Sequence, residues 1–212
     1  MHWKLFILFI LISAGVQAQS LSAGFKKLSR PEKVWAFTHP FVAKKAFHLT
    51  KKVLAVCDSL RQVKALDGNG NGDQLDAFRH SYWMALLTIH IGGQKAYRLG
   101  YAHEKGNKME FKKNKMENNS LPDSMSCVMD IINDEIGIDI GQVYKKEKAG
   151  ETDQELIGEM IGQVTDGNLR ILLKNKKGDF LDCNNNIIDL ALYKGIWGIP
   201  KCLVGSFAAP RK

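Results

Sequence analysis

Apolar residues recur at the spacing of an α-helix along most of the chain, which predicts a mainly α-helical fold. The clearest amphipathic segment runs from Asp76 to about Ile91 and stops at two consecutive glycines. Because one chain of this length can bury one substantial core, we expect a single compact domain of about five or six helices. The other predicted helices run from Pro40 to about Leu60, Gln94 to about Glu104, about Ser124 to Tyr144, and Thr152 to about Thr165. Thr152 and Glu155 have the spacing of a capping box, which predicts the start of the last of these helices.

Polar and glycine-rich segments separate the predicted helices. Residues 67–74 form a glycine-rich loop, and the lysine- and asparagine-rich residues 105–119 show no apolar period, which predicts a mobile loop. Short apolar runs at 169–173 and 180–181 flank a turn at 176–179 and predict a small C-terminal hairpin. We therefore divide the chain into a signal peptide (1–18), a lead-in (19–34), a helical domain (35–173) and a cysteine-containing tail (174–212).

The first eighteen residues have the order of a cleavable secretory signal. Lys4 precedes an apolar run, and small residues lead to a Val-Gln-Ala triplet that ends at Ala18. The run is well short of the ~20 residues that span a bilayer. The residue after the predicted cleavage site is Gln19 and no cysteine is near it, so a lipid anchor has no attachment point. We expect a bacterial periplasmic or secreted protein without a transmembrane span after cleavage.

Cleavage would leave a basic chain, with 29 Lys and Arg against 22 Asp and Glu. A basic surface attracts anionic small molecules or polymers, nucleic acid among them, although scattered lysines also serve solubility alone. The four cysteines allow two disulfides in three connectivities, or four separate thiols. We predict that Cys183 pairs with Cys202, because both lie in the tail, where a bridge of that span contributes ~3 kcal/mol.

The segment DAFRHSYW places four chemically distinctive residues on one stripe of a helix: Asp76, Arg79, His80 and Trp83. A carboxylate one turn before a histidine can accept a ring N–H and leave the other nitrogen for a proton or a metal. Arg79 adds a donor fork suited to phosphate or carboxylate. The alternative is a surface ion pair beside a core histidine.

Two later segments carry further candidates. His103 and Glu104 are adjacent, so both reach one site only if the helix ends or bends there, which Gly106 would allow; otherwise they form a solvated helix end. In MDIINDEIGIDIG, polar residues and glycines share one face, which predicts close approach to another helix rather than an exposed acidic face. That face holds Asp130, Asn133, Asp134, Gly137 and Gly141.

Together with THPFVAKKAF, the motifs DAFRHSYW, AHE and MDIINDEIG resemble an uncharacterised bacterial domain family. That family occurs in exported proteins and at the ends of polymorphic-toxin-like proteins. The resemblance covers about Trp35 to Ile171 and implies an all-helical domain without an established activity. It also implies asparagine at the position of Asp134, and the tail after Lys174 is peculiar to this sequence.

A looser similarity links the chain to helical metal-dependent phosphohydrolases, which place His, His-Asp and Asp on separate helices. The corresponding residues here would bind a divalent metal: His80, His103, Glu104 (in place of aspartate) and Asp130. As catalytic residues we expect His80, His103, Glu104, Arg79 and Asp76. Trp83, Asn133 and Asp134 are expected to contact these residues and hold them in position.

Residues 67–73 also fit the first positions of an EF-hand-type calcium loop, through Asp67, Asn69, Asn71, Gly72 and Asp73. The twelfth position is Phe78 instead of a bidentate carboxylate, so calcium binding would be weak, and a turn before a helix explains the pattern as well.

Three functions remain open at this point. The first is a hydrolase, metal-dependent through the residues above, that acts on an anionic, phosphoester-like substrate. The second is a noncatalytic exported binding or interaction domain whose polar residues form a structural network. The third is a toxin-related effector domain, which follows from the family resemblance.

Overall fold

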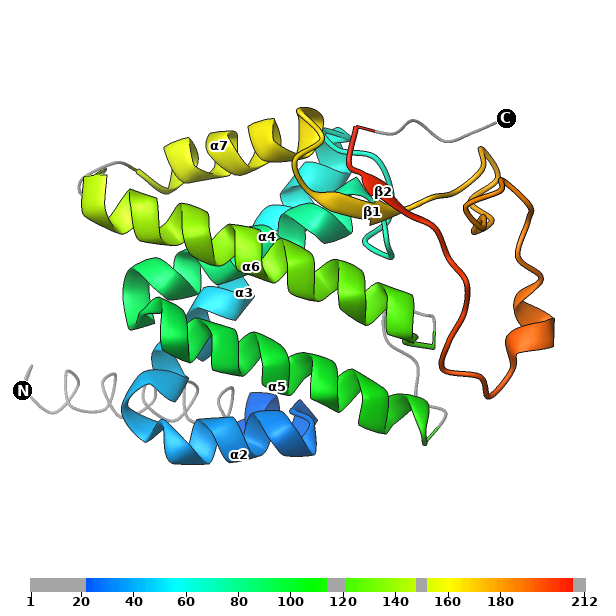
Figure 1. Cartoon of the computed structure of the whole chain (residues 1–212). Helices are drawn as coiled ribbons and strands as arrows, with labels where there is room; N and C mark the ends of the chain where they lie inside the picture. The colour runs from blue at the N-terminus through cyan, green and yellow to red at the C-terminus, as the bar shows by residue number, and fades with distance from the viewer. Residues whose placement is uncertain (1–21, 114–120, 148–151, 208–212) are drawn as a thin grey trace, which may run out of the picture.

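The computed structural model describes residues 22–113, 121–147 and 152–207. The predicted signal peptide lies outside these residues, as does part of the predicted loop at 105–119. The mainly α-helical fold is confirmed (Figure 1). A short helix at 22–27 is followed by α2 (Arg30–Thr38), α3 (Pro40–Val63), α4 (Gln74–Ile91), α5 (Gly93–Phe111), α6 (Ser124–Glu147) and α7 (Asp153–Thr165).

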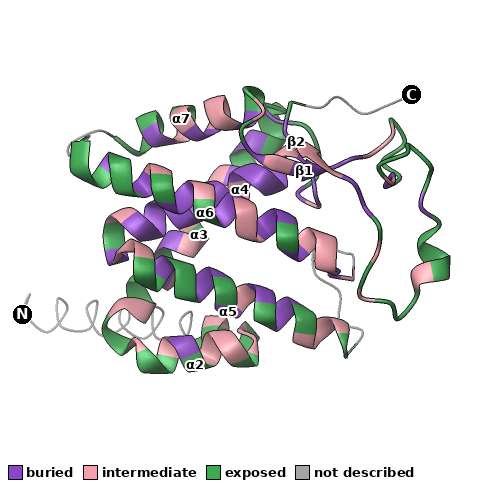
Figure 2. Cartoon of the chain, in the orientation of Figure 1, coloured by how far each residue is buried: buried purple, intermediate pink, exposed green. Residues whose placement is uncertain are grey.

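Helix α4 forms the centre of the domain, and residues all around its circumference are buried (Figure 2). It contacts α3, α5, α6 and α7. A helix that is covered on every side has no solvent face for its polar groups, so polar side chains on α4 must meet partners from neighbouring helices. This position makes the stripe that begins at Asp76 an interior feature.

Side-chain caps define where three helices begin. Ser29 and Glu32 form a capping box at α2, and Thr152 and Glu155 form the predicted capping box at α7. Asp73 caps α4 by accepting the backbone N–H of Asp76.

The predicted close approach of the glycine face of α6 is confirmed. A Cβ atom at Gly137 would lie 2.2 Å from the carbonyl oxygen of Ser81, and one at Gly141 would lie 2.7 Å from that of Ala85. Glycine at these two positions therefore allows the backbones of α4 and α6 to touch.

One expectation about local structure is wrong: helix α5 does not end near Glu104 but continues to Phe111, because Gly106 lies against Ser29 and allows α5 to pack on the start of α2. The expected hairpin is present in short form. The chain pairs antiparallel across the predicted turn through a bridge between Lys174 and Phe180 and a hydrogen bond from the backbone N–H of Leu181 to the carbonyl oxygen of Leu173 at 3.0 Å. The two strands, however, pair with each other: β1 (Arg170–Leu172) is antiparallel to β2 (Leu203–Gly205). The strand partner comes from the distant tail.

The C-terminal segment packs beside the start of α6 and includes the 3₁₀-helix η1 (Leu190–Tyr193) (Figure 1). Cys183 and Cys202 form the predicted disulfide, with Cα atoms 4.7 Å apart. Within the described ranges, none of the helices has the length and apolar character to cross a membrane.

Candidate functional site

The polar stripe of α4 is fixed at its start by the glycine-rich loop. Asp76 accepts a hydrogen bond from the backbone N–H of Gly72 at 2.6 Å and forms an ion pair with Arg79. Arg79 in turn donates to the carbonyl oxygen of Gly70 at 3.1 Å. The loop thus closes over the first turn of α4 and holds both charged side chains beside His80.

His80 lies at the centre of a group of carboxylates and is only 2% exposed. Its Nδ1 is 3.1 Å from Asp134 Oδ1, and its Nε2 is 3.5 Å from Asp130 Oδ1 and 3.8 Å from Asp76 Oδ1. Burial by itself lowers the pKa of His80, but the negative charges of Asp130 and Asp134 outweigh it and raise the pKa to about 9.

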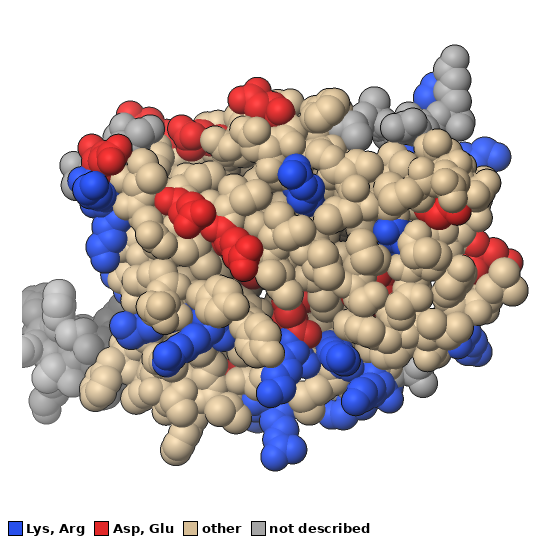
Figure 3. Space-filling view, viewed as in Figure 1, with Lys and Arg blue, Asp and Glu red and all other residues tan. Residues whose placement is uncertain are grey.

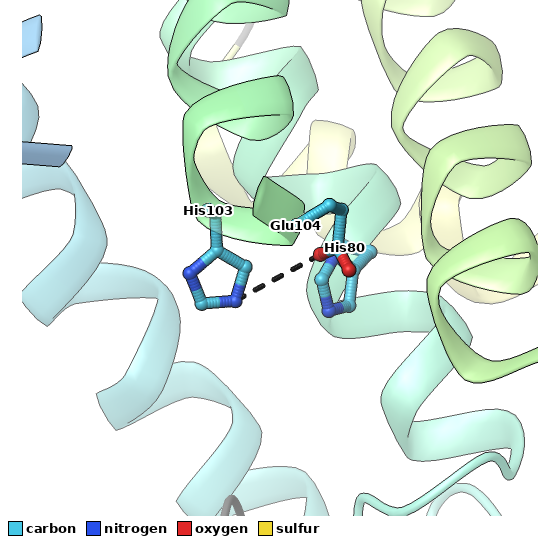
Figure 4. Close-up of side chains that lie close together, drawn as sticks. All are labelled: His80, His103 and Glu104. Carbon is cyan, nitrogen blue, oxygen red and sulfur yellow. Dashed lines mark ion pairs between the residues drawn. The ribbon is translucent and has the colours of Figure 1, made fainter. Parts of the chain in front are cut away.

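His103 and Glu104 reach this region from α5 without a break in the helix. His103 faces α2, where its Nδ1 is 3.1 Å from Glu32 Oε1, and Glu104 faces the interior. Figure 4 shows the two side chains beside His80, with 3.9 Å between His103 Nε2 and Glu104 Oε1. The His80 and His103 ring centres are 6.0 Å apart.

Two carboxylate oxygens in this cluster, Glu104 Oε1 and Asp130 Oδ1, are buried and have no hydrogen-bond partner among the described residues. Burial raises the pKa of Asp130 well above its usual value, and the nearby carboxylates raise it further against the opposing effect of His80. Burial likewise raises the pKa of Glu104. Both groups are therefore costly to ionise without a further positive charge.

Two sets of ligand atoms in the cluster are close enough to share one cation. His80, His103 and Glu104 form one set and Asp76, His80 and Asp130 the other, with the atoms of each set within 4.8 Å of one another. His80 belongs to both. All residues predicted as metal ligands thus lie in one cluster, and Asp76 and Arg79 lie at its side.

A pocket of about 240 Å³ gives access to one side of the cluster. Its lining includes Arg79, His80 and His103 together with Thr50 and Leu54 of α3. The side chain of His103 is 25% exposed, whereas that of His80 is 3% exposed. A molecule in the pocket would meet His103 and Arg79 first.

Of the three residues expected to hold the site in position, Trp83 and Asp134 contact the histidines and Asn133 does not. Trp83 lines the pocket, contacts both histidine rings edge-on and donates to Thr50 Oγ1 at 2.9 Å. Asp134 contacts His80, in space left by Gly100, where a Cβ would lie 2.5 Å from Asp134 Oδ2.

Asn133 points away from the histidines. Its amide exchanges two hydrogen bonds with the backbone of Arg170, at 2.9 and 2.8 Å, and so holds β1 on α6.

In the loop that fits the start of a calcium-binding motif, the carboxylate of Asp73 is already hydrogen-bonded by the backbone. Asp73 accepts backbone N–H groups from residues 69, 70, 71 and 76. The ammonium group of Lys174 also enters the loop, donating to the carbonyl oxygen of Asn71 and lying 3.9 Å from Asp73. The arrangement favours the helix-start interpretation, with a lysine where a cation would bind.

Glu32 is the residue of the cluster that sequence reasoning missed. It lies in the segment assigned as a lead-in, yet its carboxylate contacts His103 and lines the pocket. Burial raises its pKa, but the contact with His103 outweighs this effect and lowers the pKa overall. The Ser29 to Glu32 spacing predicts a helix start, but not a contact with α5.

Residues 33–168 match the family described as Domain of unknown function (DUF6973). The chain therefore belongs to this family, in agreement with the expected membership of an uncharacterised family. Comparison with curated proteins and with solved structures found no match for the chain.

Proposed function

We propose that the domain is a hydrolase that binds a divalent cation at the cluster and acts on an anionic, phosphoester-like substrate. The observation that carries this proposal is a pair of buried oxygens, Glu104 Oε1 and Asp130 Oδ1, which have no hydrogen-bond partner among the described residues and lie beside the Nε2 atoms of two histidines. A cation held by His80, His103 and Glu104 would partner the first oxygen, one held by Asp76, His80 and Asp130 would partner the second, and either would offset the excess of buried carboxylates.

The orientation of the histidines supports the same conclusion. In both rings Nδ1 contacts an outer carboxylate, Asp134 for His80 and Glu32 for His103, and Nε2 faces the inner carboxylates. Metal-binding histidines commonly have this arrangement, because the outer carboxylate fixes the tautomer that leaves the second nitrogen unprotonated. Two histidines and carboxylates are ligands typical of catalytic zinc.

The pocket suggests how the reaction would be divided among the residues. A bound divalent cation supplies Lewis-acid activation of water or of a phosphoryl oxygen. Arg79, at the pocket wall, would hold an anionic oxygen of the substrate. His103, the more exposed histidine, would hold the cation through its Nε2 atom, with Glu32 fixing its ring through Nδ1.

An exported location is part of the proposal. The disulfide between Cys183 and Cys202 fits an oxidising compartment, as does the predicted signal peptide. Intact-mass measurement of secreted or periplasmic protein should show that residues 1–18 have been removed, and retention of those residues would contradict cleavage.

The test is metal binding by the purified, chelator-treated protein. We expect Zn²⁺ or Mn²⁺ to raise the melting temperature, and His103→Ala to weaken binding at least ~10-fold. His90→Ala, at the exposed C-terminal end of α4, is the matched control. Hydrolysis of a generic phosphodiester should require the same metal and be lost in His103→Ala. The absence of any metal-induced shift in the wild-type protein would overturn the proposal.

One observation favours a structural network as the second candidate: His80 is almost fully buried, with carboxylates beside both ring nitrogens. A histidine in this position can hold α4 and α6 together without doing chemistry. This alternative expects His80→Ala to lower stability strongly while neither the variant nor the wild-type protein binds metal.

A further inference from the structure

Charge is divided unevenly between the helices. Helices α2, α3 and α5 carry eleven Lys and Arg against four Asp and Glu, whereas α6 and α7 carry two against eight. Figure 3 shows the basic side chains gathered along the side where α2 and α5 lie, with acidic side chains over α6 and α7. One side of the domain therefore attracts anions, even though the interior cluster is acidic.

A groove of about 530 Å³ lies between α2 and α5 on this basic side. Its floor is apolar and includes Val34, Trp35 and Tyr101, and its rim carries Arg30, Arg98 and Lys105. Of the described residues that line it, none is acidic, and the three rim cations form no ion pair within the described part of the chain. The groove thus joins apolar surface to uncompensated positive charge.

Large apolar side chains project beside the groove. Phe37 at the end of α2 is 82% exposed and Phe41 at the start of α3 is 97% exposed. Neither lines the groove, so a small molecule bound in the groove would leave both phenylalanines in water. An extended surface could contact the phenylalanines and the rim cations together.

We propose that this face, made of Val34, Phe37, Phe41, Tyr101 and the rim cations Arg30, Arg98 and Lys105, docks on an anionic phospholipid bilayer. The arginines and the lysine would bind headgroup phosphates, while the phenylalanines enter the boundary of the acyl chains. Aromatic and basic side chains with no acidic group are the combination that interfacial binding requires. The inference does not depend on the proposed hydrolase activity.

Binding to vesicles tests the inference, using the protein as the expressing cell processes it. Cosedimentation should show at least ~10-fold tighter binding to phosphatidylglycerol-containing vesicles than to phosphatidylcholine vesicles, and binding should weaken as salt increases. Phe37→Ser with Phe41→Ser should reduce binding ~10-fold or more. Phe207→Ser with Leu192→Ser, which removes similarly exposed apolar residues from the C-terminal segment, should leave binding unchanged.

A second set of test and control variants probes the charged residues of the face. Arg98→Gln with Lys105→Gln should weaken vesicle binding, whereas Lys176→Gln with Lys177→Gln, an exposed pair on a distant turn, should have little effect. Unchanged melting temperatures would show that the variants are folded. Equal losses in test and control variants would overturn the proposal. So would equal affinity for the two vesicle types, or concentration-dependent self-association without vesicle binding.

Discussion

Two regions of the molecule bury charge, and they do so differently. Where the C-terminal segment packs on the start of α6, Asp123 and Lys201 form a buried ion pair at 2.5 Å. Asp123 also accepts the backbone N–H groups of Met125 and Ser126, and the Lys201 ammonium lies 3.7 Å from the centre of the Phe180 ring. Here one negative charge meets one positive charge, and Asp123 is fully hydrogen-bonded.

The cluster around His80 is not balanced in this way. Four carboxylates lie beside two histidines and one arginine, and two of the carboxylate oxygens have no hydrogen-bond partner among the described residues. The carboxylates are those of Asp76, Glu104, Asp130 and Asp134, and the cations are His80, His103 and Arg79. A protein that needed only to fix its helices could use a paired arrangement like that of Asp123. This imbalance is what the proposed metal site would require, because a bound cation would offset the excess of buried carboxylates.

The largest expected effect is the loss of the balanced pair. Lys201→Met leaves the fully buried Asp123 carboxylate without its counter-charge and should lower the free energy of unfolding by ~3 to 5 kcal/mol. Urea denaturation of chelator-treated protein would measure this. Lys176→Met, on an exposed turn, is the control. If Lys201→Met behaved like this control, the pair could not be called structural.

A smaller effect is expected where α4 and α6 touch. In Gly137→Ala the new methyl group would collide with the Ser81 carbonyl oxygen, forcing the helices apart at a cost of ~1 to 3 kcal/mol. The same movement would separate His80 from the carboxylates of α6 and weaken metal binding.

Gly158→Ala is the matched control for that change, because a Cβ there meets no described atom within 4 Å. Inside α7 it should raise stability by ~1 kcal/mol. Circular dichroism during urea denaturation would separate the two outcomes. A Gly137→Ala variant as stable as wild type would contradict the close backbone contact between α4 and α6.

The helical fold was largely predictable from the sequence, because periodicity and caps are local signals. The Thr152 to Glu155 capping box and the glycine face of α6 predicted local structure that the molecule has. The pairing of β1 with β2 was not predictable, since thirty residues (173–202) lie between the strands and each strand has only three. Long-range pairing of short strands leaves almost no periodic pattern in a sequence.

The candidate site was predictable in its residue types but not in its geometry. Polar side chains on fixed faces of α4, α5 and α6 indicated convergence, and the structure brings His80, His103, Glu104 and Asp130 together. The contact of Glu32 with His103 depends on how α2 packs on α5, which no local pattern gives. The direction of Asn133 likewise depends on β1, whose position is set by the tail.

The smallest effect is expected for Asp130→Asn, which should raise the free energy of unfolding but abolish metal binding. The substitution keeps the shape of the side chain, which can no longer ionise. Because burial raises the pKa of Asp130, its contribution to stability is fully present below the unfolded value of 3.8 and is lost as the pH rises through the folded value. Asp130→Asn removes this loss, so metal-free protein should gain ~1 kcal/mol at neutral pH.

The gain should shrink as the pH falls and disappear below the unfolded value of 3.8, where the aspartate is protonated in both the folded and the unfolded chain. In the same variant the melting temperature should no longer rise on addition of Zn²⁺ or Mn²⁺, because one ligand oxygen is gone. Asp139→Asn, on the exposed face of the same helix, should change neither property. A variant that is less stable without metal would mean that Asp130 is a structural partner of His80, as Asp123 is of Lys201, and that the contrast between the two regions does not hold.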